Sequence, residues 1–176
     1  MKNKKLEIWL TVLVVFALFA VLVYATTETK SPKSCSGTWS SCNLAYYNDG
    51  AYAQANVTNV TNKTSMWMNY TWSNMTNTSN ITNVTVILDA YHSHVGPGGP
   101  FLEVSVSWNN GLTYGPVHLV GVGDSASFYD VDVTGDTTWT PVKLLPANFK
   151  VKVTCLTTTS PGNCYLDWLP VEVTFT

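Results

Sequence analysis

The sequence predicts an all-β protein: a single antiparallel β-sandwich or jelly roll of about eight strands, preceded by an N-terminal hydrophobic helix. From residue 50 onward, apolar and polar residues alternate in short runs rich in Val, Thr, Tyr and Trp. Gly, Pro, Asn and Ser separate these runs, as is typical of turns. The 176 residues suffice for one domain with its own core and a terminal segment, but not for two such domains.

The N-terminal segment predicts export. Residues 8–27 contain no charge, and as a helix they would extend about 30 Å, enough to span a bilayer. The lysines that precede them keep the N-terminus in the cytoplasm and send the remainder outside. Small residues in Val23-Tyr24-Ala25 favour cleavage after Ala25, whereas the length of the apolar run favours a retained anchor.

Both fates stay open, so residues 1–25 are assigned to a signal peptide or a transmembrane anchor. If they are not cleaved, residues 6–25 associate with the membrane. The segment 26–38 is polar and contains a proline, which predicts a flexible stalk or linker and a poor donor strand. The β-sandwich domain is then residues 39–176, and its expected location is extracellular, at the cell surface.

The expected strands share period-two alternation bounded by turn residues. They cover residues 51–57, 65–72, 81–91, 101–109, 116–122, 126–134, 148–156 and 164–176. Alternation also predicts which side chains face the core, as follows: Met66, Met68, Tyr70 and Trp72; Val84, Val86 and Leu88; Leu102, Val104, Val106 and Trp108; Phe149, Val151, Val153 and Cys155. Asn69 is expected to point outward. Pro170 cannot donate to a ladder, so the last strand should contain a bulge or lie at an edge there.

The four cysteines form two sequence-local pairs. Cys35 and Cys42 lie seven residues apart, and Cys155 and Cys164 lie nine apart across the loop of an expected hairpin. In an oxidising compartment these spacings favour the disulfides Cys35–Cys42 and Cys155–Cys164, although four cysteines permit three connectivities. A zinc site is disfavoured because it would need cysteines two to four residues apart.

An unusual density of N-glycosylation sequons occurs between residues 56 and 85. Each sequon is an asparagine followed two positions later by Ser or Thr, without proline between them. The eight acceptors are Asn56, Asn59, Asn62, Asn69, Asn74, Asn77, Asn80 and Asn83. Asn and Thr also suit a polar loop and an edge strand, but that explanation accounts for the residue types and not for their phase. We therefore expect covalent glycans here, with crowding that prevents full occupancy.

The charge of the chain excludes one class of partner. Charged residues make up 11%, the basic residues are all lysines, and the body after the first cysteine is mildly acidic. Nucleic-acid binding needs a basic face, usually with arginine, so a nucleic-acid partner is not expected. Low charge combined with many sequons resembles the surface proteins of archaea.

Several segments resemble β-sandwich domains of phage and microbial surface proteins. The stretch WSSCNLAYYNDGAYAQA (39–55) is similar to their W-x-N-P-x-N-A…DG-x-YA opening. ITNVTVILDAY, WTPVKLLPANFKVKV and YLDWLPVEVTFT are similar to three of their later strands. The resemblance covers most of residues 39–176 and implies a scaffold with varied roles, in which Trp39, Trp139 and Trp168 occupy structural positions. The sequon tract, YHSHVGPGGP and Ser41-Cys42 in place of Asn-Pro depart from that pattern.

Candidate chemical groups are few, and neither an enzyme nor a cofactor is expected. His92 and His94 have a spacing that suits two metal ligands on one strand face, but we interpret them as exposed loop histidines because no third ligand lies nearby. A faint calcium-loop pattern lacks its terminal Glu and remains a weak metal candidate, formed by Asp130, Asp132 and Asp136. Asp89 and Glu103 have the residue types of a glycosidase pair, and nothing distinguishes them from outward acids on neighbouring strands.

Two functions are compatible with these observations. The first is a structural or adhesive, self-associating subunit of a surface filament, surface layer or virion coat. The second is a tethered carbohydrate-binding module, in which exposed aromatic residues stack on sugar rings. The aromatic candidates for that role are Trp108, Tyr114, Trp139 and Trp168.

Overall fold

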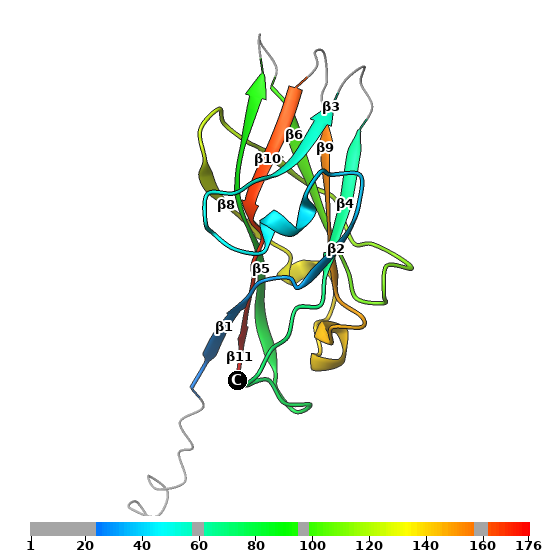
Figure 1. Ribbon diagram of the computed structural model, residues 1–176. Coiled ribbons are helices and arrows are strands. Elements are labelled where there is room, and N and C mark those ends of the chain that lie inside the picture. The colour runs from blue at the N-terminus through cyan, green and yellow to red at the C-terminus, as the bar shows by residue number, and fades with distance from the viewer. Residues whose placement is uncertain (1–23, 58–61, 95–98, 157–161) are drawn as a thin grey trace, which may run out of the picture.

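Two antiparallel β-sheets packed face to face form the body of the protein (Figure 1). The computed structural model describes residues 24–57, 62–94, 99–156 and 162–176. The first sheet, sheet A, has the strand order β1-β11-β5-β10-β3, and β8 pairs with the other side of β5. Its strands are β1 (Thr26–Lys30), β3 (Ala53–Val57), β5 (Ile81–His94), β8 (Ser127–Asp132), β10 (Gly162–Trp168) and β11 (Val171–Phe175). The predicted antiparallel β-sandwich is therefore confirmed.

The second sheet, sheet B, has the order β2-β4-β9-β6-β7. Its strands are β2 (Ser34–Gly37), β4 (Lys63–Met68), β6 (Phe101–Ser107), β7 (His118–Gly121) and β9 (Lys150–Leu156). Three short 3₁₀ helices complete the described elements: η1 (Cys42–Ala45), η2 (Thr134–Asp136) and η3 (Pro141–Leu144). No helix among the described residues is long and apolar enough to cross a membrane. The segment expected to do so lies outside them except for Tyr24 and Ala25, so its role stays a prediction.

The apolar core lies between the sheets, where alternation predicts it for three of the strands. The predicted core residues that these strands bury completely include Val84, Val86 and Leu88 of β5, Leu102, Val104 and Val106 of β6, and Val151, Val153 and Cys155 of β9. Trp139 and Leu144 from the connection between β8 and β9 also join the core. A network of edge-to-face rings includes Phe149 and Tyr70 with centroids 5.5 Å apart.

The predicted inner face of β4 is wrong. Trp67 and Ser65 are buried, while Met66 and Met68 are only half-buried. Asn69 has φ 65°, and this left-handed residue reverses the alternation, so that Tyr70 returns to the core at an odd spacing from Trp67. Asn69 itself is exposed, as expected.

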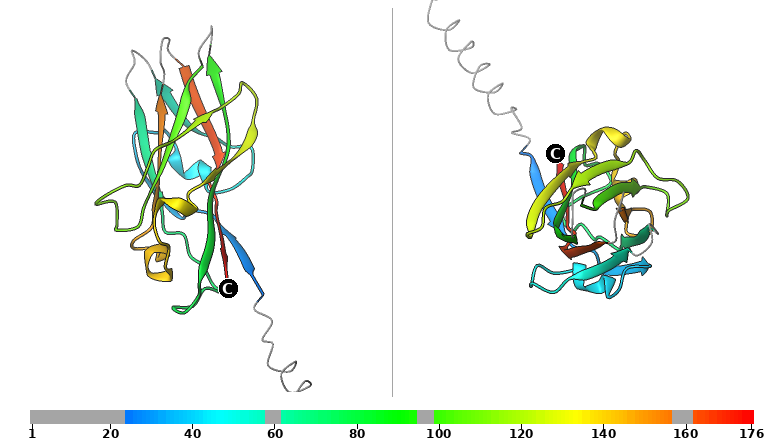
Figure 2. Two further views of the ribbon diagram at one scale, coloured as in Figure 1. Left: turned by 180° about the vertical axis from the view of Figure 1, so that it is seen from behind. Right: turned by 90° about the horizontal axis from the view of Figure 1, so that it is seen from above.

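The prediction of a flexible stalk over residues 26–38 is also wrong. β1 pairs with β11 over its whole length, and β2 pairs with β4. Figure 2 shows β1 running beside β11 at the end of the sandwich where the C-terminus lies. Glu28 is the one buried residue of β1, and it is held by hydrogen bonds rather than by apolar contact. A strand stabilised in this way lacks the apolar alternation that sequence reasoning uses.

The last predicted strand is divided as expected at Pro170. β10 ends at Trp168 and β11 begins at Val171, with a register shift between Leu166 and Trp168. Because β11 pairs with both β1 and β5, the C-terminal strand offers no free edge for lateral association.

The structure contains the two disulfides that the cysteine spacing favours. Cys35–Cys42 connects β2 with η1, next to the core. Cys155–Cys164 connects β9 of sheet B with β10 of sheet A, across the completely buried interior. The described residues contain no free cysteine.

Candidate functional site

Five aromatic side chains gather on the outer side of sheet A, and we call them the aromatic face. They are Tyr52, Tyr91, Phe128, Tyr165 and Trp168. Their position follows from alternation, because Leu88, Ala90 and Leu166 on the same strands are buried in the core. Figure 1 shows β3, β10, β5 and β8, which carry or adjoin these residues, side by side in one layer.

A stacked tyrosine pair forms the centre of the aromatic face. Tyr91 of β5 and Tyr165 of β10 are direct register partners, and their rings lie parallel with centroids 4.5 Å apart. The ring of Tyr52, just before β3, stands edge-on to both, 5.0 Å from Tyr91 and 6.3 Å from Tyr165. The amide of Gln54 donates a hydrogen bond of 3.5 Å to the Tyr165 hydroxyl. All three tyrosines are half-buried, so this surface presents both rigid aromatic rings and their polar hydroxyl groups.

Two carboxylates adjoin the tyrosines. Asp167 is 2% exposed and accepts hydrogen bonds from the backbone N–H groups of Asp49 (3.3 Å) and Gly50 (3.0 Å). Asp89 is 8% exposed, and no hydrogen bond to its carboxylate is found in the described part of the chain. Burial raises the pKa of Asp89, and the nearby charge of Asp167 raises it further. Burial and these two carboxylates likewise raise the pKa of Tyr52.

Phe128 and Trp168 extend the aromatic face toward β8. They are the cross-strand partners of Asp89 on its two sides, and their rings meet edge to face at 6.5 Å. The indole N–H of Trp168 donates to the Ser31 hydroxyl at 2.8 Å. Phe128 is 58% exposed, which is unusual for so large an apolar side chain and is consistent with a contact surface.

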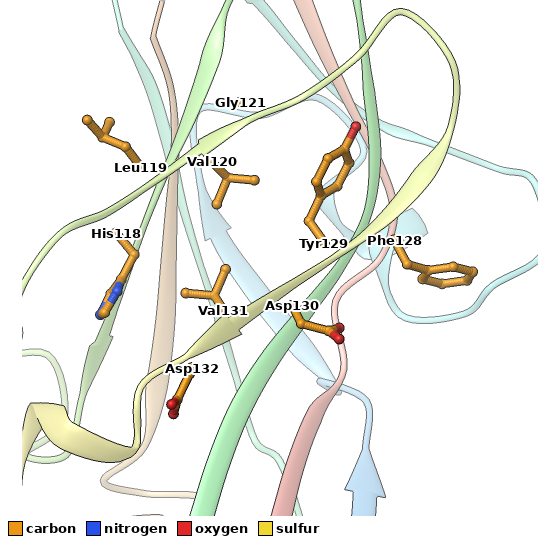
Figure 3. Close-up of a pocket in the computed structure, with 9 residues that line it drawn as sticks. All are labelled: His118, Leu119, Val120, Gly121, Phe128, Tyr129, Asp130, Val131 and Asp132. Carbon is orange, nitrogen blue, oxygen red and sulfur yellow. The ribbon is translucent and has the colours of Figure 1, made fainter.

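A groove of about 540 Å³ separates β7 from β8, the edge strands of the two sheets on the same side of the sandwich (Figure 3). In Figure 3, Val120, Val131 and Tyr129 point into the gap, whereas Phe128 points away from β7. The Tyr129 hydroxyl accepts a hydrogen bond from the backbone of Gly123 at 2.8 Å. His118, Asp130 and Asp132 also line the groove, so its surface is mixed and more polar than apolar.

The weak metal candidates do not form a site. Asp130 is exposed, Asp132 accepts a hydrogen bond from the backbone of Thr134, and Asp136 pairs with His118 at 3.1 Å. Bonding to Thr134 lowers the pKa of Asp132. Within the described residues, no group of three His, Cys, Asp or Glu side chains could hold a metal ion.

The other predicted chemical groups are not brought together either. His92 lies in β5 and is half-buried, and the side chain of His94 lies outside the described set. Asp89 belongs to sheet A and Glu103 to sheet B, so these two acids are not on neighbouring strands. The structure therefore gives no support to a glycosidase pair.

Of the four aromatic residues predicted to bind sugar, one lies on the aromatic face. Trp168 is that residue, while Trp139 is buried and donates its indole N–H to the backbone of Val133 at 3.0 Å. Trp108 packs edge-on against Trp139, and Tyr114 stacks under Lys152 with the ammonium 4.1 Å from its ring. Sequence reasoning missed Tyr52, Tyr91 and Tyr165. Tyr91 and Tyr165 alternate with apolar neighbours, but their pairing depends on a strand register that no local signal reveals.

The described sequon asparagines differ in accessibility. The exposed ones are Asn56, Asn62, Asn69, Asn74, Asn77 and Asn80. Asn83 is half-buried in β5 and its amide is engaged at both ends, donating to Thr85 and accepting from Thr134, each at 2.9 Å. Asn59 lies outside the described residues.

No protein-family model matches the chain, and no curated protein matches its sequence. Among solved structures, a family 11 carbohydrate-binding module from Clostridium thermocellum, in complex with a β-1,3-1,4-mixed-linked tetrasaccharide, is similar with a TM-score of 0.45 and 11% identity. That similarity covers 87% of this chain and 91% of the module. A family 29 module complexed with cellulohexaose has a TM-score of 0.47 and 13% identity, over 85% of this chain and 92% of that one. These similarities assign no residue of this chain to a site.

Proposed function

We propose that the chain is an exported carbohydrate-binding module of the cell surface and that the aromatic face holds the glycan. The observation that carries this proposal is the stacked pair Tyr91–Tyr165, edged by Tyr52 and placed beside Asp89 and Asp167. Sugar rings have C–H faces that pack on aromatic rings, and they have hydroxyls that donate to carboxylates and amides. The aromatic face supplies both kinds of group on a rigid sheet.

The export part of this proposal rests on the N-terminal segment and on the two disulfides, which suit an oxidising compartment. Surface location also agrees with the resemblance of residues 39–176 to microbial surface domains. Whether residues 1–25 are cleaved or retained decides between a secreted and a tethered module.

The direct test is binding of the full chain to a broad glycan panel, followed by calorimetry on the best ligand. Tyr91→Ala and Tyr165→Ala should each weaken binding about 10-fold, since a lost aromatic contact corresponds to about 1–2 kcal/mol. Tyr114→Ala is the matched control, because Tyr114 is equally half-buried but lies near Met66 and Lys152 on sheet B. No binding to any glycan, or equal losses in all three variants, would refute the proposal.

A structural subunit is the second candidate function, and exposed apolar residues near the free edges favour it. Leu119 on β7 is 68% exposed and Val117 just before it is 54% exposed, and β7 pairs on one side only. Self-association through this edge should be concentration-dependent in analytical ultracentrifugation, and Leu119→Lys should abolish it. A purely monomeric chain at high concentration would eliminate this candidate.

A further inference from the structure

Asp89 is an unusual group within the aromatic face. Its neighbours along β5, Leu88 and Ala90, are completely buried in the core, so Asp89 faces the outer side of sheet A. Phe128 and Trp168 flank it as register partners. Asp89 is nonetheless only 8% exposed.

The environment of Asp89 lacks any compensating donor. Asp167, the second acid of this site, is satisfied by two backbone N–H groups, whereas the described residues give Asp89 no hydrogen bond. The two acids are close enough for the charge of Asp167 to raise the pKa of Asp89, and no cation among the described residues offsets this effect. A desolvated carboxylate without a partner costs free energy, and a ligand that brings a donor or a positive charge removes that cost.

The flanking rings favour the same kind of ligand. Aromatic faces attract cations electrostatically, most strongly for Trp, and the attraction increases when water is excluded. A ligand acid would instead add a third negative charge beside Asp89 and Asp167, which is unfavourable in a partly desolvated site. Asp89 keeps 8% of its surface exposed, and its oxygens are not among the completely buried, unpaired polar atoms of the described residues, so a ligand group can reach the carboxylate.

We propose that Asp89 makes the aromatic face selective for amino sugars, with a protonated amine of a glucosamine-type unit bound to its carboxylate beside the rings of Phe128 and Trp168. This inference rests on the proposed carbohydrate-binding function and assigns its ligand class. Neutral glycans of the same size bind more weakly because a hydroxyl replaces the ammonium group. Uronic-acid polymers are excluded by charge.

The test compares the binding of three oligosaccharides of equal ring number to the full chain in detergent. They are oligomers of glucosamine, glucose and galacturonic acid, and the glucosamine and glucose oligomers have the same β-linkage. Calorimetry at pH 6 should show at least a 10-fold preference for the glucosamine oligomer over the glucose oligomer, and no binding of the acidic one. Asp89→Asn should reduce that preference to less than about 3-fold, with a larger loss of affinity for the glucosamine oligomer than for the glucose oligomer. Asp124→Asn is the matched control, because Asp124 is an exposed acid in the β7–β8 connection.

Each outcome separates this inference from the function on which it rests. Glucose-oligomer binding equal to glucosamine-oligomer binding, with no effect of Asp89→Asn, overturns the amino-sugar assignment and leaves the carbohydrate-binding proposal standing. Failure to bind any oligosaccharide on the broad panel overturns both. Thermal melts of the wild type, Asp89→Asn and Asp124→Asn show whether Asp89→Asn alters folding. If Asp89→Glu retains the preference, the loss in Asp89→Asn is due to the lost charge and not to misfolding.

Discussion

Cys155 and Cys164 belong to strands of opposite sheets, and their disulfide connects β9 of sheet B to β10 of sheet A. Both cysteines are completely buried. β10 carries Tyr165 directly after Cys164, and the bond therefore also fixes the strand on which half of the stacked tyrosine pair stands.

The first prediction concerns this bond. The Cys155→Ala/Cys164→Ala double variant should lose about 2–3 kcal/mol of unfolding free energy through loop-closure entropy, and more through lost core packing. Urea unfolding followed by tryptophan fluorescence measures the loss. Cys35→Ala/Cys42→Ala is the matched control, since its loop is similar in length but its cysteines are half-buried. Equal losses in both double variants would show that core packing adds nothing.

Glu28 gives the second prediction. Burial raises the pKa of this carboxyl, but hydrogen bonds from Ser73, from Lys30 and from the backbone of Asn74 outweigh burial and lower it from 4.5 to about 2. Because the folded pKa is below the unfolded one, the stabilisation is fully present above pH 4.5 and is lost as pH falls toward 2. Glu28→Gln should cost about 1–3 kcal/mol at neutral pH.

The measurement is the free energy of unfolding of wild type and Glu28→Gln between pH 7 and pH 2. The difference between them should stay constant down to about pH 4.5 and then shrink. Glu172→Gln on the neighbouring β11 is the control, because Glu172 accepts one long hydrogen bond of 3.4 Å from Thr29. A difference that does not change with pH would contradict the assignment of the stabilisation to the ionised carboxylate.

Glycan occupancy supplies the third prediction. If the sequons are used, Asn77 and Asn80 should be modified more than Asn83, because their side chains are exposed while Asn83 is half-buried and hydrogen-bonded at both ends of its amide. Mass spectrometry of peptides from native protein gives the occupancy of each site. Full modification of Asn83 would mean that glycans are added before β5 forms, and unmodified mass at every site would eliminate glycosylation.

The eight segments predicted from alternation overlap the nine strands β3 to β11, and most of these strands have an apolar face against the core, as in Val84, Val86 and Leu88. The same signal could not locate β1, whose one buried residue is the hydrogen-bonded Glu28, or β2, which has no buried residue. It also assigned the wrong face to β4, because the left-handed Asn69 shifts the phase after Met68. Local pattern therefore predicts apolar strands and fails where polar contacts or special backbone angles decide.

The aromatic face could not be predicted from the sequence, for a related reason. Tyr91 and Tyr165 are 74 residues apart in the chain numbering, and only the register Tyr165↔Tyr91 brings them into contact. A shift of one residue would turn one ring into the core. Trp108 and Trp139, which composition made candidates, pack into or against the core instead. Site prediction needed the cross-strand pairing, which is a property of the whole fold.

The last prediction links glycosylation to ligand binding through Asn56. On the outer side of sheet A, the row Asn56–Asn163–Ser93 lies next to the row Gln54–Tyr165–Tyr91. Asn56 and Tyr165 are diagonal neighbours on adjacent strands, and such neighbours are about 7–8 Å apart, so the first sugar of a glycan on Asn56 can reach the tyrosine pair. An occupied Asn56 should therefore compete with an external glycan for the aromatic face.

Asn56→Gln, made in the native host, should strengthen glycan binding at least 3-fold by calorimetry, because it removes the competing sugar and leaves the tyrosines in place. Asn77→Gln is the matched control, since Asn77 is also an exposed sequon residue but lies in the β4–β5 connection, far along the chain from β3. Occupancy of Asn56 in the parent protein must be established by mass spectrometry of the same preparation. Unchanged affinity in Asn56→Gln, when the parent is occupied there, would show that the glycan on Asn56 points away from the tyrosine pair.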